Sequence, residues 1–131
     1  LGVRDCLEFP GVLTSAQMAE EMRRAHVFVM PSAIENLSTT LREAMLVGTP
    51  AVSASVGCVP EYLHHGENGY LYRYEEYELL AQYVMQLFAE PDKAAAFSAA
   101  ARQTIRRMYV REDAGEQLVE IYRQVLQTAR G

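Results

Sequence analysis

The stretch Pro31 to Gly48, PSAIENLSTTLREAMLVG, decides how the rest of the chain is interpreted. The apolar run before it, His26 to Met30, is typical of a short strand buried on both faces of a parallel sheet. Within the stretch, apolar residues recur at helical spacing, and Gly48 followed by a proline two residues later is a helix stop. We therefore predict a strand, a turn and a helix from about Ser38 to Val47.

The turn between this strand and this helix is polar. It contains Asn36, Ser38, Thr39 and Thr40, which can cap a helix. The first N–H groups of a helix have no partner within the helix, and open α/β sheets bind anionic ligands where such a helix follows a parallel strand. The turn is therefore a candidate phosphate site.

Two glutamates, Glu35 and Glu43, bracket the turn with seven residues between them. Helical side chains lean toward the helix N-terminus, so both carboxylates are expected to reach one cleft. Carboxylates repel phosphate, so we assign them to hydroxyl groups as hydrogen-bond acceptors and leave the phosphates to the backbone amides. A sugar joined to a diphosphate matches this pattern.

The run PS-x-x-E-x7-E-A-M-x-x-G-x-P-x-V, continued by VGCVPEYLHHGENGYLY, resembles the donor-binding segment of retaining glycosyltransferases of the family 4 type. The match covers about eighteen positions in order, far more than a lone glycine fingerprint. Two departures bear on which sugar is bound: Asn36-Leu37-Ser38 follows the first glutamate, and Gly57-Cys58 stands where a glycine pair is usual. The resemblance implies an α/β fold, with a Rossmann-like parallel sheet and flanking helices, as part of the C-terminal domain of a GT-B enzyme.

The resemblance also implies an activity: transfer of a sugar from a nucleotide-diphosphate donor with retention of anomeric configuration. No cofactor or obligatory metal is expected, since the nucleotide sugar is a substrate. Glu35 would be the catalytic residue that holds the donor sugar, without acting as a base, and Glu43 would bind the ribose hydroxyls. The expected donor-binding residues are Glu35, Asn36, Leu37, Ser38, Thr39, Thr40, Glu43 and Gly57.

The length of 131 residues fits one domain at most and is short for a two-domain enzyme. We interpret residues 1–131 as a fragment of a nucleotide-sugar-binding domain, with the sheet in about 1–72 and helices in about 75–129. The acceptor, a glycan, lipid or small molecule, would be bound largely by a missing N-terminal domain. The isolated fragment is therefore expected to be inactive.

A formal charge of −5 argues against nucleic-acid binding and broad binding to anionic membranes. The sequence has no apolar run of membrane-spanning length and no signal-peptide pattern. The spacing of Cys6 and Cys58 is unlike that of metal ligands and favours reduced thiols in a cytoplasmic protein. Peripheral contact with the inner face of the membrane is left open.

The remaining elements are predicted from local signals. Asp5 to Phe9 is predicted as a strand, and Thr14-x-x-Gln17 as a capping box that opens a helix of about ten residues. That helix would turn a stripe of apolar residues toward the sheet: Leu13, Met18, Met22 and Ala25. Later predictions are strands at Ala51 to Ala54 and Tyr70 to Tyr72, a helical turn at Val59 to Leu63, and helices at about 75–89, 92–107 and 111–128.

The complete domain would have the strand order 3-2-1-4-5-6, and this chain would supply only the equivalents of strands three to six. Asp5 to Phe9 would then lie at the far edge, and Val27 to Met30 would lose the strand that normally covers its flank. Unpaired edges invite association. We expect the isolated fragment either to move Asp5 to Phe9 beside Val27 to Met30 or to pair this edge with another copy.

Two rival functions remain: a GT-B-like nucleotide-sugar epimerase, and a binding module that keeps the fold without turnover. Of the other polar residues, His64 and His65 are expected to be exposed and His26 to pack. We explain the glycine at position 69 by a φ angle that other residues tolerate poorly. The glycine at position 57 could be needed either for backbone geometry or for the cleft.

Overall fold

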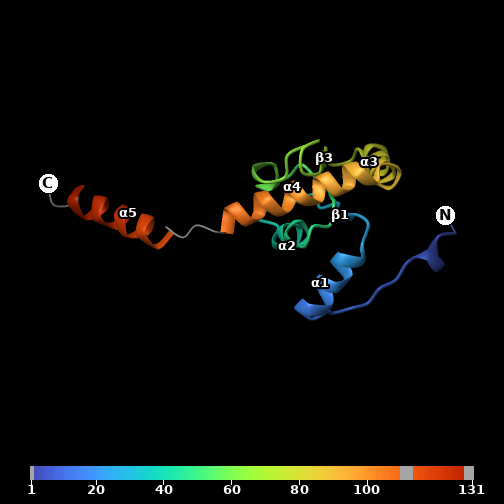
Figure 1. Ribbon diagram of the computed structural model, residues 1–131, viewed down its shortest axis with the longest axis horizontal. Helices are drawn as coiled ribbons and strands as arrows, with labels where there is room; N and C mark the ends of the chain where they lie inside the picture. Colours follow the sequence, from blue (N-terminus) through green and yellow to red (C-terminus); the bar gives the residue numbers. More distant parts are fainter. Residues whose placement is uncertain (1, 110–113, 129–131) are drawn as a thin grey trace.

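The computed structural model describes residues 2–109 and 114–128. Figure 1 shows a central body of sheet and helices, from which the N-terminal segment and the last helix extend in different directions. The elements in chain order are η1 (Arg4–Cys6), α1 (Ser15–Arg24), β1 (Phe28–Met30), α2 (Thr39–Val47), β2 (Ala51–Ala54), η2 (Val59–Glu61), β3 (Tyr70–Tyr72), α3 (Tyr77–Ala89), α4 (Pro91–Tyr109) and α5 (Ala114–Thr128).

The sheet has three parallel strands in the order β1-β2-β3. Phe28 is opposite Ala51, and Val52 is opposite Tyr70. All four residues of the central strand β2 are buried, as expected for a strand covered on both faces. The predicted strands at Ala51 to Ala54 and Tyr70 to Tyr72 are confirmed, and so is the parallel sheet.

Two layers of helices cover the sheet, because successive strand residues point to opposite faces. Ala51 of β2 packs with α2 and the buried end of α4, in a cluster containing Met30, Leu41, Met45, Val59, Tyr62, Leu63, Ala101 and Ile105. Val52 and Ala54 pack on the other face with Tyr70, Tyr72, Leu87 and Phe97. The helix α4 contributes to both clusters, so it ties the two layers together.

The predicted strand at Asp5 to Phe9 is wrong. Arg4–Cys6 forms a single 3-10 turn, and residues 7–9 have no regular structure. The apolar side chain of Phe9 is 85% exposed. A strand is stabilised by pairing with a neighbour, and this segment lies beside no strand of the sheet. The local signals that predicted this strand were therefore insufficient without a partner.

β1 is an edge strand, and no described strand pairs with its outer edge. Val29 in this strand is 37% exposed. Phe28 donates its N–H to the Pro50 carbonyl on the β2 side at 2.8 Å. Backbone groups alternate in direction along a strand, so the Val29 N–H points to the open flank. The structure thus contradicts the first of the two expected outcomes, in which Asp5 to Phe9 moves beside β1, whereas pairing with another copy stays a prediction.

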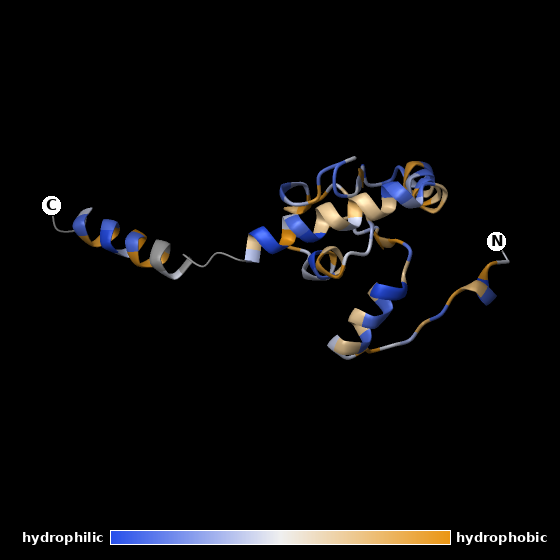
Figure 2. Ribbon diagram, in the orientation of Figure 1, coloured by the Kyte–Doolittle hydropathy of each residue, from blue (hydrophilic) through white to orange (hydrophobic). Residues whose placement is uncertain are grey.

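The last helix, α5, presents its apolar side chains to solvent. Its large hydrophobic residues are between 48% and 63% exposed: Leu118, Val119, Ile121, Tyr122, Val125 and Leu126. Figure 2 shows orange and blue segments alternating along this helix. Among the described residues, no helix has the length and apolarity needed to cross a membrane.

Candidate functional site

The turn between β1 and α2 is built as its sequence predicts. Ser38 caps α2 with extended backbone angles, and its Oγ accepts a hydrogen bond from the Leu41 N–H at 3.3 Å. At the other end, Gly48 adopts the left-handed conformation with φ 92°. Arg102 of α4 donates Nε and Nη2 to the Val47 carbonyl at 3.0 and 2.6 Å, which satisfies an end group of the helix. Both ends of α2 are therefore fixed.

The first turn of α2 presents backbone donors to solvent. Thr39 and Thr40 are exposed, and in the described part of the chain their N–H groups donate to no protein acceptor. Ser38, in contrast, is buried. The helix dipole adds a partial positive charge at this end. The turn therefore has the donors and the polarity of an anion site.

The Glu35 loop is held against the loop that follows β2. Cys58 donates its N–H to the Asn36 carbonyl at 3.0 Å. Gly57 has φ +52°, and a Cβ there would overlap the Glu35 carbonyl oxygen and lie 2.8 Å from the Asn36 carbonyl oxygen. The two loops are therefore in contact, and the close approach explains why glycine stands at position 57.

The Glu35 side chain is half-buried. Its Oε1 accepts a hydrogen bond from the neighbouring Asn36 N–H at 3.1 Å. The loop therefore groups Glu35, Asn36, Ser38 and Gly57, while Leu37 is 50% exposed beside them.

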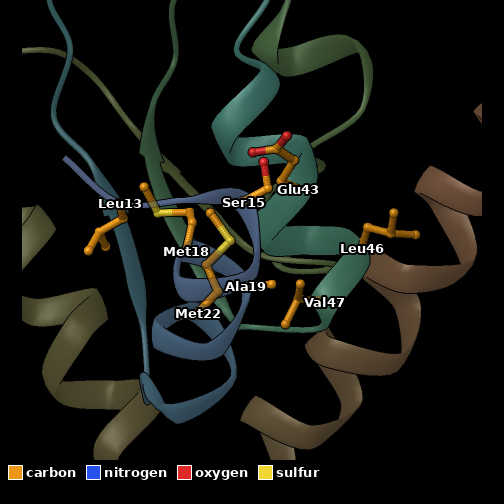
Figure 3. Close-up of a pocket in the computed structure, with 8 residues that line it drawn as sticks. All are labelled: Leu13, Ser15, Met18, Ala19, Met22, Glu43, Leu46 and Val47. Atoms are coloured by element: carbon orange, nitrogen blue, oxygen red, sulfur yellow. The ribbon is translucent and has the colours of Figure 1, made fainter.

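Glu43 lies farther along α2, in a different environment. It lines a cavity of about 330 Å³ between α1 and α2, together with Leu13, Ser15, Met18, Ala19, Met22, Leu46 and Val47. Figure 3 shows the Glu43 carboxylate beside the Ser15 hydroxyl, above a wall made by the two methionines. We call this the α1–α2 pocket. Glu35 does not line this pocket. Glu35 lies in the loop before α2, whereas Glu43 lies in the middle of the helix.

The α1–α2 pocket was missed by sequence reasoning. The capping box at Thr14 is confirmed, with Gln17 N–H on Thr14 Oγ1 at 3.3 Å and Thr14 N–H on Gln17 Oε1 at 2.9 Å. The apolar stripe that follows, Met18 and Met22 included, faces α2 and the pocket, not the sheet as predicted. Periodicity identifies an apolar face but not what it faces.

Two buried polar groups beneath the turn were also missed. The Tyr62 hydroxyl and the Arg42 Nε have no hydrogen-bond partner in the described residues. Burial raises the pKa of Tyr62 above its ordinary 10.0, and Glu35 and Cys58 add to the rise, whereas the Arg42 guanidinium and the Ser38 backbone oppose it. From the sequence, Tyr62 was predicted only to belong to a helical turn.

The three histidines are exposed, whereas Gly69 is buried. His64 and His65 are exposed as expected, and His26, also exposed, stacks on Phe88 with ring centroids 5.2 Å apart. Gly69 does not have a positive φ, so that explanation is wrong; a Cβ would instead collide with the Leu63 side chain and the Ala51 carbonyl. Residues 2–109 and 114–128 contain no group of three His, Cys, Asp or Glu side chains placed to hold a metal ion.

Known proteins resemble this chain along most of its length. It is 36% identical over 120 residues to an alpha-maltose-1-phosphate synthase of Mycolicibacterium smegmatis, an alignment that covers 87% of this chain and 31% of that protein. It is 34% identical over 101 residues to a D-inositol 3-phosphate glycosyltransferase of Streptomyces scabiei, covering 77% of this chain and 23% of that protein. The chain thus spans about a third or less of the length of these relatives.

Solved structures give the same result for the fold. A sucrose-phosphate synthase from Thermosynechococcus elongatus superposes with a TM-score of 0.84 at 25% identity, over 96% of this chain and 32% of that chain. The Anabaena protein HepE in complex with UDP-glucose superposes with a TM-score of 0.81 at 25% identity, over 92% of this chain and 34% of that chain. The predicted Rossmann-like α/β fold of GT-B glycosyltransferases is confirmed. The family model "Glycosyl transferases group 1" matches residues 1–104, and the chain belongs to this family.

Proposed function

We propose that this chain is the donor-binding part of a retaining glycosyltransferase of the family 4 type, which transfers a sugar from a nucleotide-diphosphate donor. The observation that carries the proposal is the first turn of α2, where the exposed N–H groups of Thr39 and Thr40 lie at the carboxyl end of β1. The HepE structures with UDP-glucose and with UDP support a nucleotide sugar as the donor class.

The proposed donor lies along α2. Its diphosphate is bound by the Thr39 and Thr40 amides, with Ser38 as the helix cap. The nucleoside extends toward Glu43, four residues along the helix from Thr39, a rise of about 6 Å at 1.5 Å per residue. The Glu43 carboxylate accepts hydrogen bonds from the ribose hydroxyls, and the apolar wall of the α1–α2 pocket provides an adjoining surface for the base.

The sugar ring lies beside the Glu35 loop. The Glu35 carboxylate accepts hydrogen bonds from sugar hydroxyls and holds the anomeric carbon in position, with Asn36 and Leu37 next to it. Gly57 acts by allowing its loop to approach the Glu35 carbonyl closely. Charge grows on the departing diphosphate in the transition state, and the helix amides stabilise it there without reorganisation. No obligatory metal ion is included in this scheme.

The remaining parts of the reaction lie outside this chain. The acceptor, a glycan, lipid or small molecule, is bound largely by an N-terminal domain, and the 131-residue chain alone is inactive. Nucleic acid is not a partner in this proposal. An acidic chain with a formal charge of −5 offers little general attraction to polyanions.

The experiment uses the full-length protein with a panel of UDP-, GDP- and ADP-sugars and candidate acceptors, followed by NMR of the anomeric proton. The expected result is transfer with the donor's anomeric configuration retained. Inversion would refute the retaining mechanism. Formation of an epimer in the absence of transfer would favour the epimerase, and tight donor binding without either product would favour a binding module.

A further inference from the structure

The buried hydroxyl of Tyr62 has no described partner although its ring is fully enclosed. Tyr62 is 1% exposed and packs in the cluster that contains Leu41, Val59 and Leu63. Its hydroxyl makes no hydrogen bond within the described residues. An unpaired buried donor destabilises a protein, so a group of this kind needs an explanation.

The surroundings of this hydroxyl belong to the candidate site. The groups close enough to act on its ionisation are Arg42, Glu35, Cys58 and the backbone of Ser38. Ser38 is near it without the geometry of a hydrogen bond. Tyr62 therefore reaches the underside of the α2 N-terminus and of the Glu35 loop.

This region contains buried hydrogen-bond donors without described partners and an acceptor that is not fully used. Two donors, the Tyr62 hydroxyl and the Arg42 Nε, are buried without partners. The nearby Glu35 carboxylate can accept about four hydrogen bonds. In the described structure it accepts one, from the adjacent Asn36 N–H at 3.1 Å. The region around Tyr62 therefore contains two buried donors without described partners and a carboxylate with unused capacity.

The backbone holds Tyr62 at a fixed place relative to this carboxylate. Tyr62 donates its N–H to the Val59 carbonyl at 3.2 Å, and Cys58 donates its N–H to the Asn36 carbonyl at 3.0 Å. Gly57 brings the same segment against the Glu35 carbonyl. The Glu35 loop and the segment that carries Tyr62 are therefore held against each other by backbone contacts.

We propose that Tyr62 is a positioning residue for Glu35: when the donor sugar is bound, the Glu35 carboxylate turns to accept a hydrogen bond from the Tyr62 hydroxyl. The bond fixes the carboxylate in the orientation that holds the sugar hydroxyls, with Arg42 beside it. This inference rests on the proposed role of Glu35 in donor binding. Tyr62 itself does not touch the sugar, because it is buried.

The test is Tyr62→Phe in the full-length protein, which keeps the ring and removes only the hydroxyl. Tyr72→Phe is the matched control, because the Tyr72 hydroxyl is also buried and without a described partner, while the groups that act on its ionisation do not include Glu35 or Arg42. The melting temperature of each variant, and kcat and KM with the donor sugar that supports turnover, are measured.

We expect Tyr62→Phe to lower kcat about 10- to 100-fold, the effect of one hydrogen bond to a charged group, with a much smaller change in donor KM. Its melting temperature should stay the same or rise, since an unpaired buried hydroxyl is removed. Tyr72→Phe should leave kcat unchanged.

A double-mutant cycle separates positioning from a general packing effect. If Tyr62 acts through Glu35, Tyr62→Phe should cost little further activity in a Glu35→Gln background. Additive losses would overturn the inference, as would unchanged kcat in Tyr62→Phe alone, the result expected if a buried water satisfies the hydroxyl. A Tyr62→Phe variant that fails to fold would also overturn it, because the hydroxyl would then be structural. Unchanged turnover in Glu35→Gln would instead refute the proposed function.

Discussion

Gly57→Ala tests whether the close approach of two loops builds the site. A Cβ at this position would overlap the Glu35 carbonyl oxygen, with the Asn36 carbonyl oxygen at 2.8 Å and the Glu35 carbonyl carbon at 2.9 Å. All three are backbone atoms, so none can move aside as a flexible side-chain end does. The Glu35 loop must shift as a unit, and the Cys58 to Asn36 hydrogen bond of 3.0 Å is strained or lost.

Three effects contribute to the loss of folding stability that we expect for Gly57→Ala. Alanine in the left-handed conformation costs about 1 to 2 kcal/mol, an overpacked contact about 1 to 3 kcal/mol, and one lost backbone hydrogen bond about 0.5 to 1.5 kcal/mol. Because a shift of the loop relieves part of the overlap, we expect a destabilisation of about 2 to 4 kcal/mol. The moved loop should also lower kcat.

Gly66→Ala is the matched control. Gly66 also has a left-handed φ, +78°, but a Cβ there would meet nothing within 4 Å. This variant should show only the conformational cost of about 1 to 2 kcal/mol, with kcat unchanged. Urea unfolding and steady-state kinetics of both variants, made in the full-length protein, measure the difference. Equal destabilisation of the two variants, or full activity in Gly57→Ala, would refute the reasoning.

Three further predictions concern other parts of the chain. In the full-length protein, Glu43→Ala should weaken donor binding by about 1 to 3 kcal/mol, because ribose hydroxyls lose their acceptor; unchanged affinity by calorimetry would disprove the role. The isolated chain should self-associate through the open flank of β1, and Val29→Pro, which removes an outward N–H, should reduce association in sedimentation experiments more than Val29→Ala does; a chain that is monomeric at all concentrations would contradict this. Burial raises the pKa values of Tyr62 and Tyr72 above 10.0, so the unfolded chain loses these protons more readily than the folded one. The unfolding free energy is therefore unaffected by them below pH 10.0 and falls as the pH rises through the folded pKa values. Replacing both by Phe should flatten the fall in unfolding free energy above that pH, and an unchanged slope would show that neither phenol is responsible.

The helix α2 could be predicted because its signals are local. Ser38 and Gly48 mark its two ends within a few residues of the chain, and both act in the structure as caps. The same holds for the capping box at Thr14. Caps satisfy backbone groups of the helix they end, so their effect does not depend on distant residues.

The incorrect predictions and the missed features share a different cause. Each concerns a structural feature that depends on residues distant in sequence. The segment from Asp5 to Phe9 has the residues of a strand but no neighbour with which to pair. The stripe containing Met22 was correctly placed on a helix, yet only the packed structure shows that it faces α2 across a pocket. The isolated hydroxyl of Tyr62 is similarly invisible in the sequence, because the absence of a partner is a property of the whole fold.

The most direct test of the central claim is a crystal structure of the full-length protein with the nucleotide sugar that supports turnover. The account predicts diphosphate oxygens within hydrogen-bonding distance of the Thr39 and Thr40 amides, the ribose beside Glu43 and the sugar beside Glu35. A diphosphate bound elsewhere, for example in the groove lined by His64, Gln103 and Arg107, with the first turn of α2 left unoccupied, would contradict it.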